Sequence, residues 1–219
     1  MKIEKKYEAV IFDLDGTLID SMGVWEKIDA EFLGKRGLKS SIEYSEAIKA
    51  KSFYDTAKYT IEKFSLDETV EELIDEWHEM ALFEYSYNVK LKHYAKEYIE
   101  TLKKKGIKIV LATSCSKYLF EPTLINNEIY EYFDVLCTTE EVATGKETPD
   151  LFLYVAEQIG VLPENCLVFE DILIAVKSAK LAGMDVYGVY DKYSDMQWEE
   201  IKGIADGAIY DFSDAPMMK

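Results

Sequence analysis

The sequence is poor in basic charge. Its 219 residues include 25 lysines and arginines against 42 aspartates and glutamates, which gives a formal net charge of −17 at pH 7. Nucleic acids and anionic membranes bind to basic surfaces, so this balance excludes both as expected partners. A phosphate-binding site on such a chain has to create a local positive field from backbone amides, a lysine or a metal ion.

Cysteines and long apolar runs are also scarce. The three cysteines lie far apart and form no CxxC pair, so free thiols in a reducing compartment are expected. The chain runs from Met1 through Lys5 and Lys6 directly into its first short apolar run, without the apolar segment of a signal peptide. No run reaches the length of a membrane span. These absences predict a cytoplasmic protein.

Apolar residues make up 48% of the chain, which is enough for a substantial core. Short β-branched apolar runs alternate with helical patterns through most of the sequence. The runs predict strands at 9–13, 107–112, 133–137, 166–169, 185–189 and 208–210. Helices are predicted at 91–102, 116–130, 150–159, 172–182 and 195–202, with Pro122 expected to split or kink the second of these. This alternation predicts an α/β fold with a doubly wound parallel sheet covered on both faces.

Residues 18–87 show helical patterns only. Val24, Ile28 and Phe32 lie four apart, and shorter helical patterns cover 42–50 and 53–64. The segment 65–68 (Ser-Leu-Asp-Glu) is typical of a capping box that starts the next helix. We therefore predict an α-helical cap at 18–87, inserted into a core formed by residues 1–17 and 88–219.

Polar residues follow four of the predicted strands. Because ligands of doubly wound sheets bind outside the carboxyl ends of the strands, these side chains are expected to meet at one edge. They are Asp13 and Asp15, then Thr113 and Ser114, then Lys146, and finally Glu170 and Asp171.

These residues stand in four short motifs: Asp13-Leu14-Asp15-Gly16-Thr17-Leu18, an apolar strand ending in Thr113, Gly145-Lys146 and Phe169-Glu170-Asp171. In order and spacing they resemble the four motifs of the haloacid dehalogenase superfamily. The predicted helical insert is similar to the cap of the β-phosphoglucomutase-like branch of that superfamily. The resemblance covers nearly the whole chain and implies a Rossmann-like core, a phosphohydrolase activity and Mg²⁺ as the cofactor.

The resemblance also implies roles for individual residues. Asp13 would attack phosphorus and form an aspartyl-phosphate, and Asp15 would protonate the leaving oxygen and then activate water. Thr113 and Lys146 complete the implied catalytic set. The implied Mg²⁺ ligands are Asp13, Asp15 through its backbone carbonyl, Glu170 and Asp171. The implied phosphate-binding residues are Asp13, Leu14, Asp15, Gly16, Thr113, Ser114 and Lys146.

Three positions depart from the pattern of the branch. Ile172 and Ala175 stand where a small or polar residue and a glycine are usual, and Glu147 stands where a proline is common. Every charged position of the four motifs is intact, so these departures bear on efficiency more than on mechanism.

Three functions remain open at the level of the sequence. The leading interpretation is a Mg²⁺-dependent phosphatase whose partner is a small phosphorylated metabolite. The alternatives are a sugar-phosphate mutase and a non-catalytic phosphosugar-binding protein. The β-phosphoglucomutases that the chain resembles carry a histidine and an arginine early in the cap. Trp25 and, by a looser alignment, Phe53 occupy those positions here, which favours hydrolysis.

Overall fold

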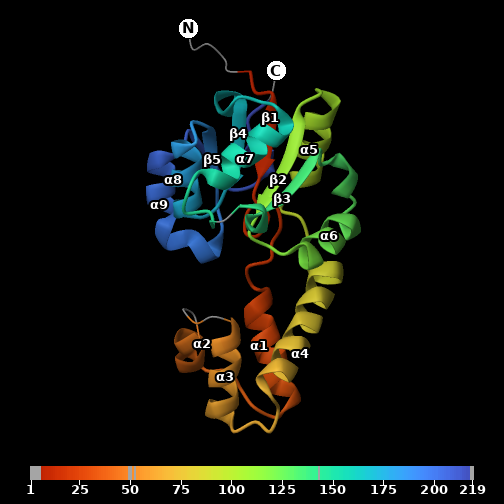
Figure 1. Ribbon diagram of the computed structural model, residues 1–219, viewed down its shortest axis with the longest axis vertical. Helices are drawn as coiled ribbons and strands as arrows, with labels where there is room; N and C mark the ends of the chain where they lie inside the picture. The colour runs from red at the N-terminus through yellow and green to blue at the C-terminus, as the bar shows by residue number, and fades with distance from the viewer. Residues whose placement is uncertain (1–5, 49–50, 52, 143, 218–219) are drawn as a thin grey trace. The chain divides into compact units, whose positions relative to one another are not determined.

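The computed structural model describes residues 6–48, 51, 53–142 and 144–217. The chain divides into two compact units, Met1–Met22 with Val89–Lys219, and Gly23–Asn88 (Figure 1). Residues 18–22, which we expected in the helical insert, lie in the first unit. Backbone hydrogen bonds hold them there: the Leu18 amide donates to the Leu14 carbonyl at 2.8 Å, and the Lys92 amide donates to the Leu18 carbonyl at 2.9 Å.

The first unit contains a six-stranded parallel sheet in the order β3-β2-β1-β4-β5-β6. The strands are β1 (Ala9–Phe12), β2 (Lys108–Thr113), β3 (Val135–Thr138), β4 (Cys166–Glu170), β5 (Asp185–Val189) and β6 (Gly207–Ile209). The order reverses between β1 and β4, which is the position where doubly wound sheets bind their ligands. The predicted fold class is confirmed.

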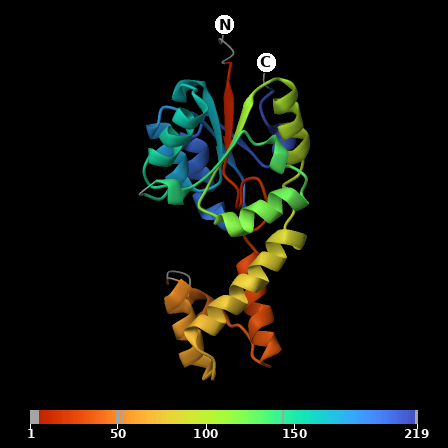
Figure 2. The ribbon, with the colours of Figure 1, turned by 45° about the vertical axis from the view of Figure 1, so that its right-hand side comes forward.

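Helices cover both faces of this sheet (Figure 2). They are α5 (Ala95–Lys104), α6 (Lys117–Asn126), α7 (Asp150–Ile159), α8 (Leu173–Leu181) and α9 (Trp198–Ile204). Short 3-10 turns lie at Tyr130–Tyr132, Thr139–Glu141, Pro163–Asn165, Lys192–Gln197 (η5) and Phe212–Asp214.

Strand β1 packs its two sides against different helical layers. Ala9 and Ile11 join a buried cluster that includes residues of α7, α8 and α9. Phe12 points the other way, because side chains alternate along a strand, and its ring lies 6.4 Å from that of Tyr98 in α5. All four residues of β1 are fully buried. The central strand is therefore rigidly held, and so is the residue that follows it.

Two predicted helices differ from the observed ones. The helix predicted at 116–130 ends at Asn126, because Glu128 adopts a left-handed conformation with φ of 57°. The expected split at Pro122 is wrong, since α6 continues through this residue, whose missing amide costs one hydrogen bond within the helix. The helix predicted at 195–202 is the 3-10 turn η5 followed by α9.

Helices are the regular secondary structure of the described residues in the second unit. It contains α1 (Val24–Lys35), α2 (Ile42–Ile48), α3 (Phe53–Phe64), α4 (Val70–Phe83) and a π-helical turn at Glu84–Asn88. Within the part of the chain that the structure describes, no helix combines the length and apolarity needed to cross a bilayer.

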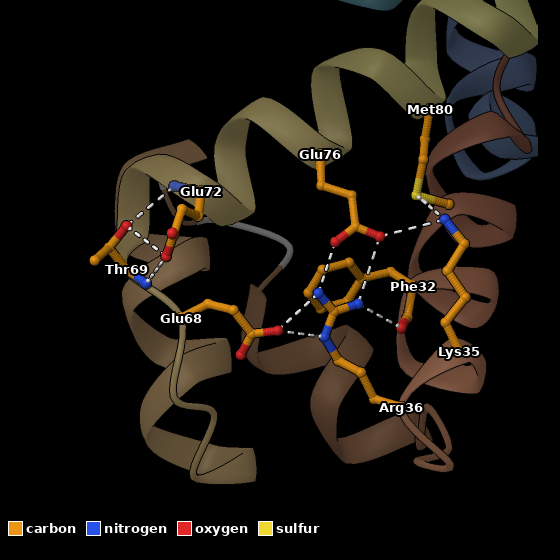
Figure 3. A network of polar contacts seen from close by, with 8 residues as sticks. All are labelled: Phe32, Lys35, Arg36, Glu68, Thr69, Glu72, Glu76 and Met80. Carbon is orange, nitrogen blue, oxygen red and sulfur yellow. Dashed lines mark hydrogen bonds and ion pairs between the residues drawn. The ribbon is translucent and has the colours of Figure 1, made fainter.

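The start of α4 corrects one detail of the sequence interpretation. The capping box is formed by Thr69 and Glu72, not by Ser65 and Glu68 (Figure 3). The Glu72 amide donates to the Thr69 hydroxyl at 3.2 Å, and the Thr69 amide donates to the Glu72 carboxylate at 2.8 Å. Ser65 has a φ of 52° and lies in the turn after α3, so it is not placed to cap α4. Glu68 instead pairs with Arg36 at 2.8 Å.

Candidate active site

Asp13 directly follows the central strand. Its amide donates to the Phe169 carbonyl of β4 at 3.0 Å, and Phe12 is aligned with Phe169 in the parallel ladder. This register places Asp13 beside Glu170, at the carboxyl edge of the sheet. The Asp13 side chain is only 8% exposed, so a charged partner is needed to stabilise it.

Lys146 is that partner. Its ammonium donates to Asp13 Oδ1 and lies 3.3 and 3.4 Å from the two carboxylate oxygens of Glu170. Burial lowers the pKa of Lys146, but the nearby Asp13 and Glu170 carboxylates outweigh it and raise that pKa above the usual range. The lysine therefore stays protonated, and it brings a fixed positive charge to a buried position.

The loop that carries Lys146 is organised by its own hydrogen bonds. The Thr144 and Thr148 hydroxyls donate to Asp150 Oδ2 at 3.0 and 2.9 Å. Glu147, one of the departures noted above, accepts a hydrogen bond from the Gly145 amide at 3.1 Å. Side-chain bonds thus supply some of the order that a proline at position 147 would give to the backbone.

Three buried acids meet at this edge. One carboxylate oxygen from each of Asp13, Glu170 and Asp171 lies within 4.8 Å of the others. Burial and the neighbouring Asp13 raise the pKa of Glu170, and the same two causes raise the pKa of Asp171 to about 7. Three carboxylates face one ammonium group, so the cluster carries an excess of negative charge.

This donor set fits a hard divalent cation. Carboxylate oxygens are the ligands that Mg²⁺ and similar ions take, and a bound cation would offset the cost of burying three acids together. The structure therefore supports a divalent metal at this position. Asp15 contributes no side-chain oxygen to this cluster of described residues, and the role expected for its backbone carbonyl stays a prediction.

Asp15 is held apart from the acid cluster. The Ser21 hydroxyl donates to Asp15 Oδ1 at 2.5 Å. The Cys115 side chain is also within hydrogen-bonding reach of Asp15, and burial together with this carboxylate raises the pKa of the thiol. A thiol that is so reluctant to ionise is a weak nucleophile, which favours the inert role for Cys115 over a redox-sensitive one.

Gly16 allows the loop after β1 to pass close to the acids. Its φ is +78°, and a Cβ atom at this position would lie 2.4 Å from Asp171 Oδ2. The Gly16 amide donates to the Ile19 carbonyl at 3.1 Å, so it is engaged within the loop rather than presented to a ligand. The next residue, Thr17, donates from its hydroxyl to Asp171 Oδ1 at 3.2 Å.

The remaining phosphate-binding candidates lie near the same edge. Thr113 ends β2 and is buried, and its hydroxyl accepts a hydrogen bond from the Cys115 amide at 3.0 Å. Ser114 follows it and is exposed. The side chain of Leu14 is fully buried in the core, so only its backbone could contact a ligand.

Three hydroxyl-bearing residues around the acids were not selected from the sequence. Thr17 and Ser21 lie within or just after the first motif, and their polar side chains are fully buried. Ser194 contacts Asp171 from 23 residues further along the chain. No motif in the sequence includes Ser194, and only the fold brings it to the cluster.

Comparison with known proteins extends these observations. A family model described as haloacid dehalogenase-like hydrolase matches residues 10–189. The chain is 30% identical over 189 residues to the phosphorylated carbohydrates phosphatase of Thermotoga maritima, covering 86% of this chain and 88% of that protein. It is 29% identical to the fructose-1-phosphate phosphatase YqaB of Escherichia coli, covering 84% and 97% respectively.

A solved structure shares the whole architecture. It is a Thermotoga maritima protein provisionally named a beta-phosphoglucomutase, with a TM-score of 0.81 and 28% sequence identity. The match covers 92% of this chain and 94% of that one.

Proposed function

The chain belongs to the haloacid dehalogenase-like hydrolase family, and from this premise we propose that it is a phosphatase of small phosphorylated metabolites. The observation that carries the proposal is the buried group of Asp13, Lys146, Glu170 and Asp171 at the carboxyl edge of the sheet. The two phosphatases compared above act, by their names, on phosphorylated carbohydrates and on fructose 1-phosphate. Carbohydrate phosphates are therefore the first substrates to test.

In the proposed mechanism Asp13 is the nucleophile. Its carboxylate attacks phosphorus and forms an aspartyl-phosphate while the ester oxygen leaves. Asp15 gives its proton to that oxygen, so the product leaves as a neutral alcohol. Asp15, now ionised, then takes a proton from a water molecule that attacks the aspartyl-phosphate, and inorganic phosphate is released with Asp13 restored.

Lys146 and Thr113 support both steps. The fixed charge of Lys146 stabilises Asp13 and the phosphoryl oxygens, and Thr113 with the amides of residues 14, 15 and 114 would hold those oxygens. We leave the Gly16 amide out of this set, because it already donates to Ile19.

We propose Mg²⁺ as the divalent metal, held by Asp13, Asp171, the backbone carbonyl of Asp15 and, directly or through water, Glu170. When bound, the ion would offset charge repulsion between the carboxylates and the phosphate dianion. Because all three cysteines are free, we also propose that the protein works in a reducing, cytoplasmic compartment.

A hydrolysis screen with phosphorylated sugars tests the proposal. Inorganic phosphate is measured for the wild type with Mg²⁺, with EDTA, and with EDTA followed by excess Mg²⁺. The same assay is run on Asp13→Asn and on Asp214→Asn, the control, which changes an exposed acid. We expect EDTA to abolish turnover, excess Mg²⁺ to restore it, and Asp13→Asn to lower kcat by about 10³-fold or more.

Full turnover in metal-free buffer, or full turnover by Asp13→Asn, would contradict this mechanism. A protein that binds sugar phosphates with Mg²⁺ but releases no phosphate from any of them would instead be the non-catalytic binding protein.

A further inference from the structure

The turn η5 makes one contact with the fourth motif and one just after it, although no motif includes the turn. The Ser194 hydroxyl donates to Asp171 Oδ2 at 3.0 Å. Gln197, at the end of the same turn, accepts a hydrogen bond from the Leu173 amide at 3.1 Å. Leu173 begins α8, and the preceding Ile172 has no polar side chain to cap that helix. The turn therefore supplies a cap and a carboxylate contact on either side of Ile172.

A buried ion pair holds η5 in place. Asp191 caps η5, since its Oδ1 accepts from the Tyr193 amide at 2.9 Å. Its Oδ2 lies 3.0 Å from the Lys92 ammonium, which also donates to the Tyr190 carbonyl at 2.7 Å. The two side chains of the pair are 11% and 4% exposed. Because little water reaches this pair, losing one partner would leave a buried charge and shift the turn.

Both oxygens of Asp171 are therefore restrained. Thr17 donates to Oδ1 at 3.2 Å and Ser194 donates to Oδ2 at 3.0 Å. A carboxylate oxygen has two lone pairs, so it can accept one hydrogen bond and still face a cation.

We propose that Ser194 is a positioning residue that orients Asp171 toward a divalent cation, and that the buried Lys92–Asp191 ion pair holds Ser194 in place. The inference rests on the metal role of Asp171 in the proposed function. It adds a set of three residues, from two distant segments, that determines how tightly the cation binds. The affinity for the phosphate ester depends on other groups, so we do not expect these three residues to change it.

Direct binding of Mn²⁺, without substrate, tests the role of Ser194. Free Mn²⁺ is measured by electron paramagnetic resonance for wild type, Ser194→Ala and Ser194→Thr. Residues that orient metal ligands typically change metal affinity by about 10- to 100-fold. We expect Ser194→Ala to raise the Kd for Mn²⁺ at least about tenfold, and Ser194→Thr, which keeps the hydroxyl, to stay near the wild type. Ser178→Ala is the matched control, because Ser178 is also a buried serine and lies in α8.

Steady-state kinetics separate positioning from general damage. Ser194→Ala should raise the Mg²⁺ concentration for half-maximal activity by a similar factor. At saturating Mg²⁺ its KM for the phosphate ester should stay within about twofold of the wild type, because the contact of Ser194 is with Asp171 and not with the groups proposed to hold the phosphate.

A double-mutant cycle tests the ion pair. We expect Lys92→Met to weaken Mn²⁺ binding as well, and the Ser194→Ala/Lys92→Met double variant to bind no more weakly than the weaker single variant, since both act through one contact. Additive losses in the cycle would overturn the link between the pair and Ser194. Thermal unfolding in EDTA identifies any variant that is simply unfolded.

The outcomes separate this inference from the proposed function. Ser194→Ala that binds Mn²⁺ as tightly as wild type overturns the inference, even if the wild type hydrolyses phosphate esters. The inference is supported if Ser194→Ala binds Mn²⁺ weakly and Asp171→Asn loses the binding that the wild type shows. This holds even if no ester is hydrolysed. Wild-type protein that binds no Mn²⁺ overturns the inference and the metal site together.

Discussion

Gly16 combines a conformational requirement with a spatial one. Its positive φ is a conformation that side chains with a Cβ rarely adopt, and the added atom would lie 2.4 Å from Asp171 Oδ2. Gly183 shares the first requirement, with φ of +83°, but nothing lies within 4 Å of an added Cβ. The two glycines therefore separate backbone strain from displacement of the Asp171 carboxylate.

We predict that Gly16→Ala abolishes metal-dependent turnover, whereas Gly183→Ala retains it. Each variant should lose about 1 to 2 kcal/mol of stability from the left-handed backbone, and Gly16→Ala should lose more because Asp171 has to move. Urea unfolding and phosphatase assays measure the two effects. Equal activity in the two variants would show that Asp171 tolerates the shift.

Asp29 is a half-buried acid of α1, and a second acid, Glu26, lies near it. Burial and, to a smaller extent, Glu26 raise its pKa to about 6. In the unfolded chain the group has an ordinary pKa of about 3.9, so the unfolded state binds fewer protons between pH 4 and 6. Stability is therefore lost as the pH rises through this window, and the full penalty is present at pH 7.

We predict that Asp29→Asn stabilises the protein at neutral pH. The gain should be about 1 kcal/mol at pH 7 after allowance for solvent screening of a half-buried group, and it should shrink toward zero near pH 4.5. Asp75→Asn, at an exposed position of α4, is the control and should change stability little at either pH. Urea unfolding at both pH values measures the difference. A gain that grows as the pH falls would contradict the assigned sign.

At the scale of elements, Arg36 joins α1 to α4 and to the segment before α4 (Figure 3). This is the only arginine in the sequence. Its guanidinium bonds Glu76 at 2.6 Å and Glu68 at 2.8 Å, and it lies 3.7 Å from the centroid of the Phe32 ring. The planar fork can make these contacts at once, whereas a lysine ammonium is a single point charge on a flexible stem.

We predict that Arg36→Lys destabilises the helical unit although the charge is kept. The expected loss is about 1 to 2 kcal/mol, because the paired bonds and the stacking on Phe32 are lost together. Lys177→Ala breaks the exposed Lys177–Glu200 pair of 2.7 Å and should cost less than about 0.5 kcal/mol. Urea unfolding followed by tryptophan fluorescence compares the two. Equal losses would mean that the network contributes no more than one surface pair.

At the scale of the molecule, all residues with a proposed catalytic role lie in the unit that contains the sheet. The two positions that would carry the polar groups of a mutase lie in the helical unit. There Trp25 and Phe53 pack edge to face with ring centroids 5.5 Å apart, and Phe53 also stacks on His78 at 5.1 Å. Neither aromatic ring can exchange a proton with a sugar hydroxyl or pair with a phosphate.

We therefore predict that the protein hydrolyses and does not isomerise. A mutase has to protect its aspartyl-phosphate from water until the sugar has turned, and the groups expected to assist are replaced here. β-Glucose 1-phosphate with Mg²⁺ and a trace of the 1,6-bisphosphate should release inorganic phosphate much faster than glucose 6-phosphate forms. Both products are measured by coupled assays, with Asp13→Asn as the blank. Faster formation of glucose 6-phosphate would identify a mutase.

Local sequence patterns alone predict which residues end the strands and therefore which groups reach one edge. Local apolar runs specify strands, and parallel strands all point their carboxyl ends the same way, so Asp13, Thr113 and Glu170 were predictable as residues at one edge of the sheet. Local apolar patterns also predict whether a segment forms a helix or a strand. The C-terminal end of α6 and the capping residues of α4 were harder to predict, because several neighbouring residues could form the turn there.

Contacts between groups from distant segments follow from the three-dimensional fold and not from local sequence patterns. The Lys146–Glu170 contact, the Arg36 network and the bond from Ser194 to Asp171 each join residues that no periodicity relates. Such contacts depend on the lateral order of the strands and on how loops pack, and these are set by the summed burial of many side chains rather than by local pattern. A hydroxyl on a short turn carries no signal in the sequence until the fold places a buried carboxylate 3.0 Å away.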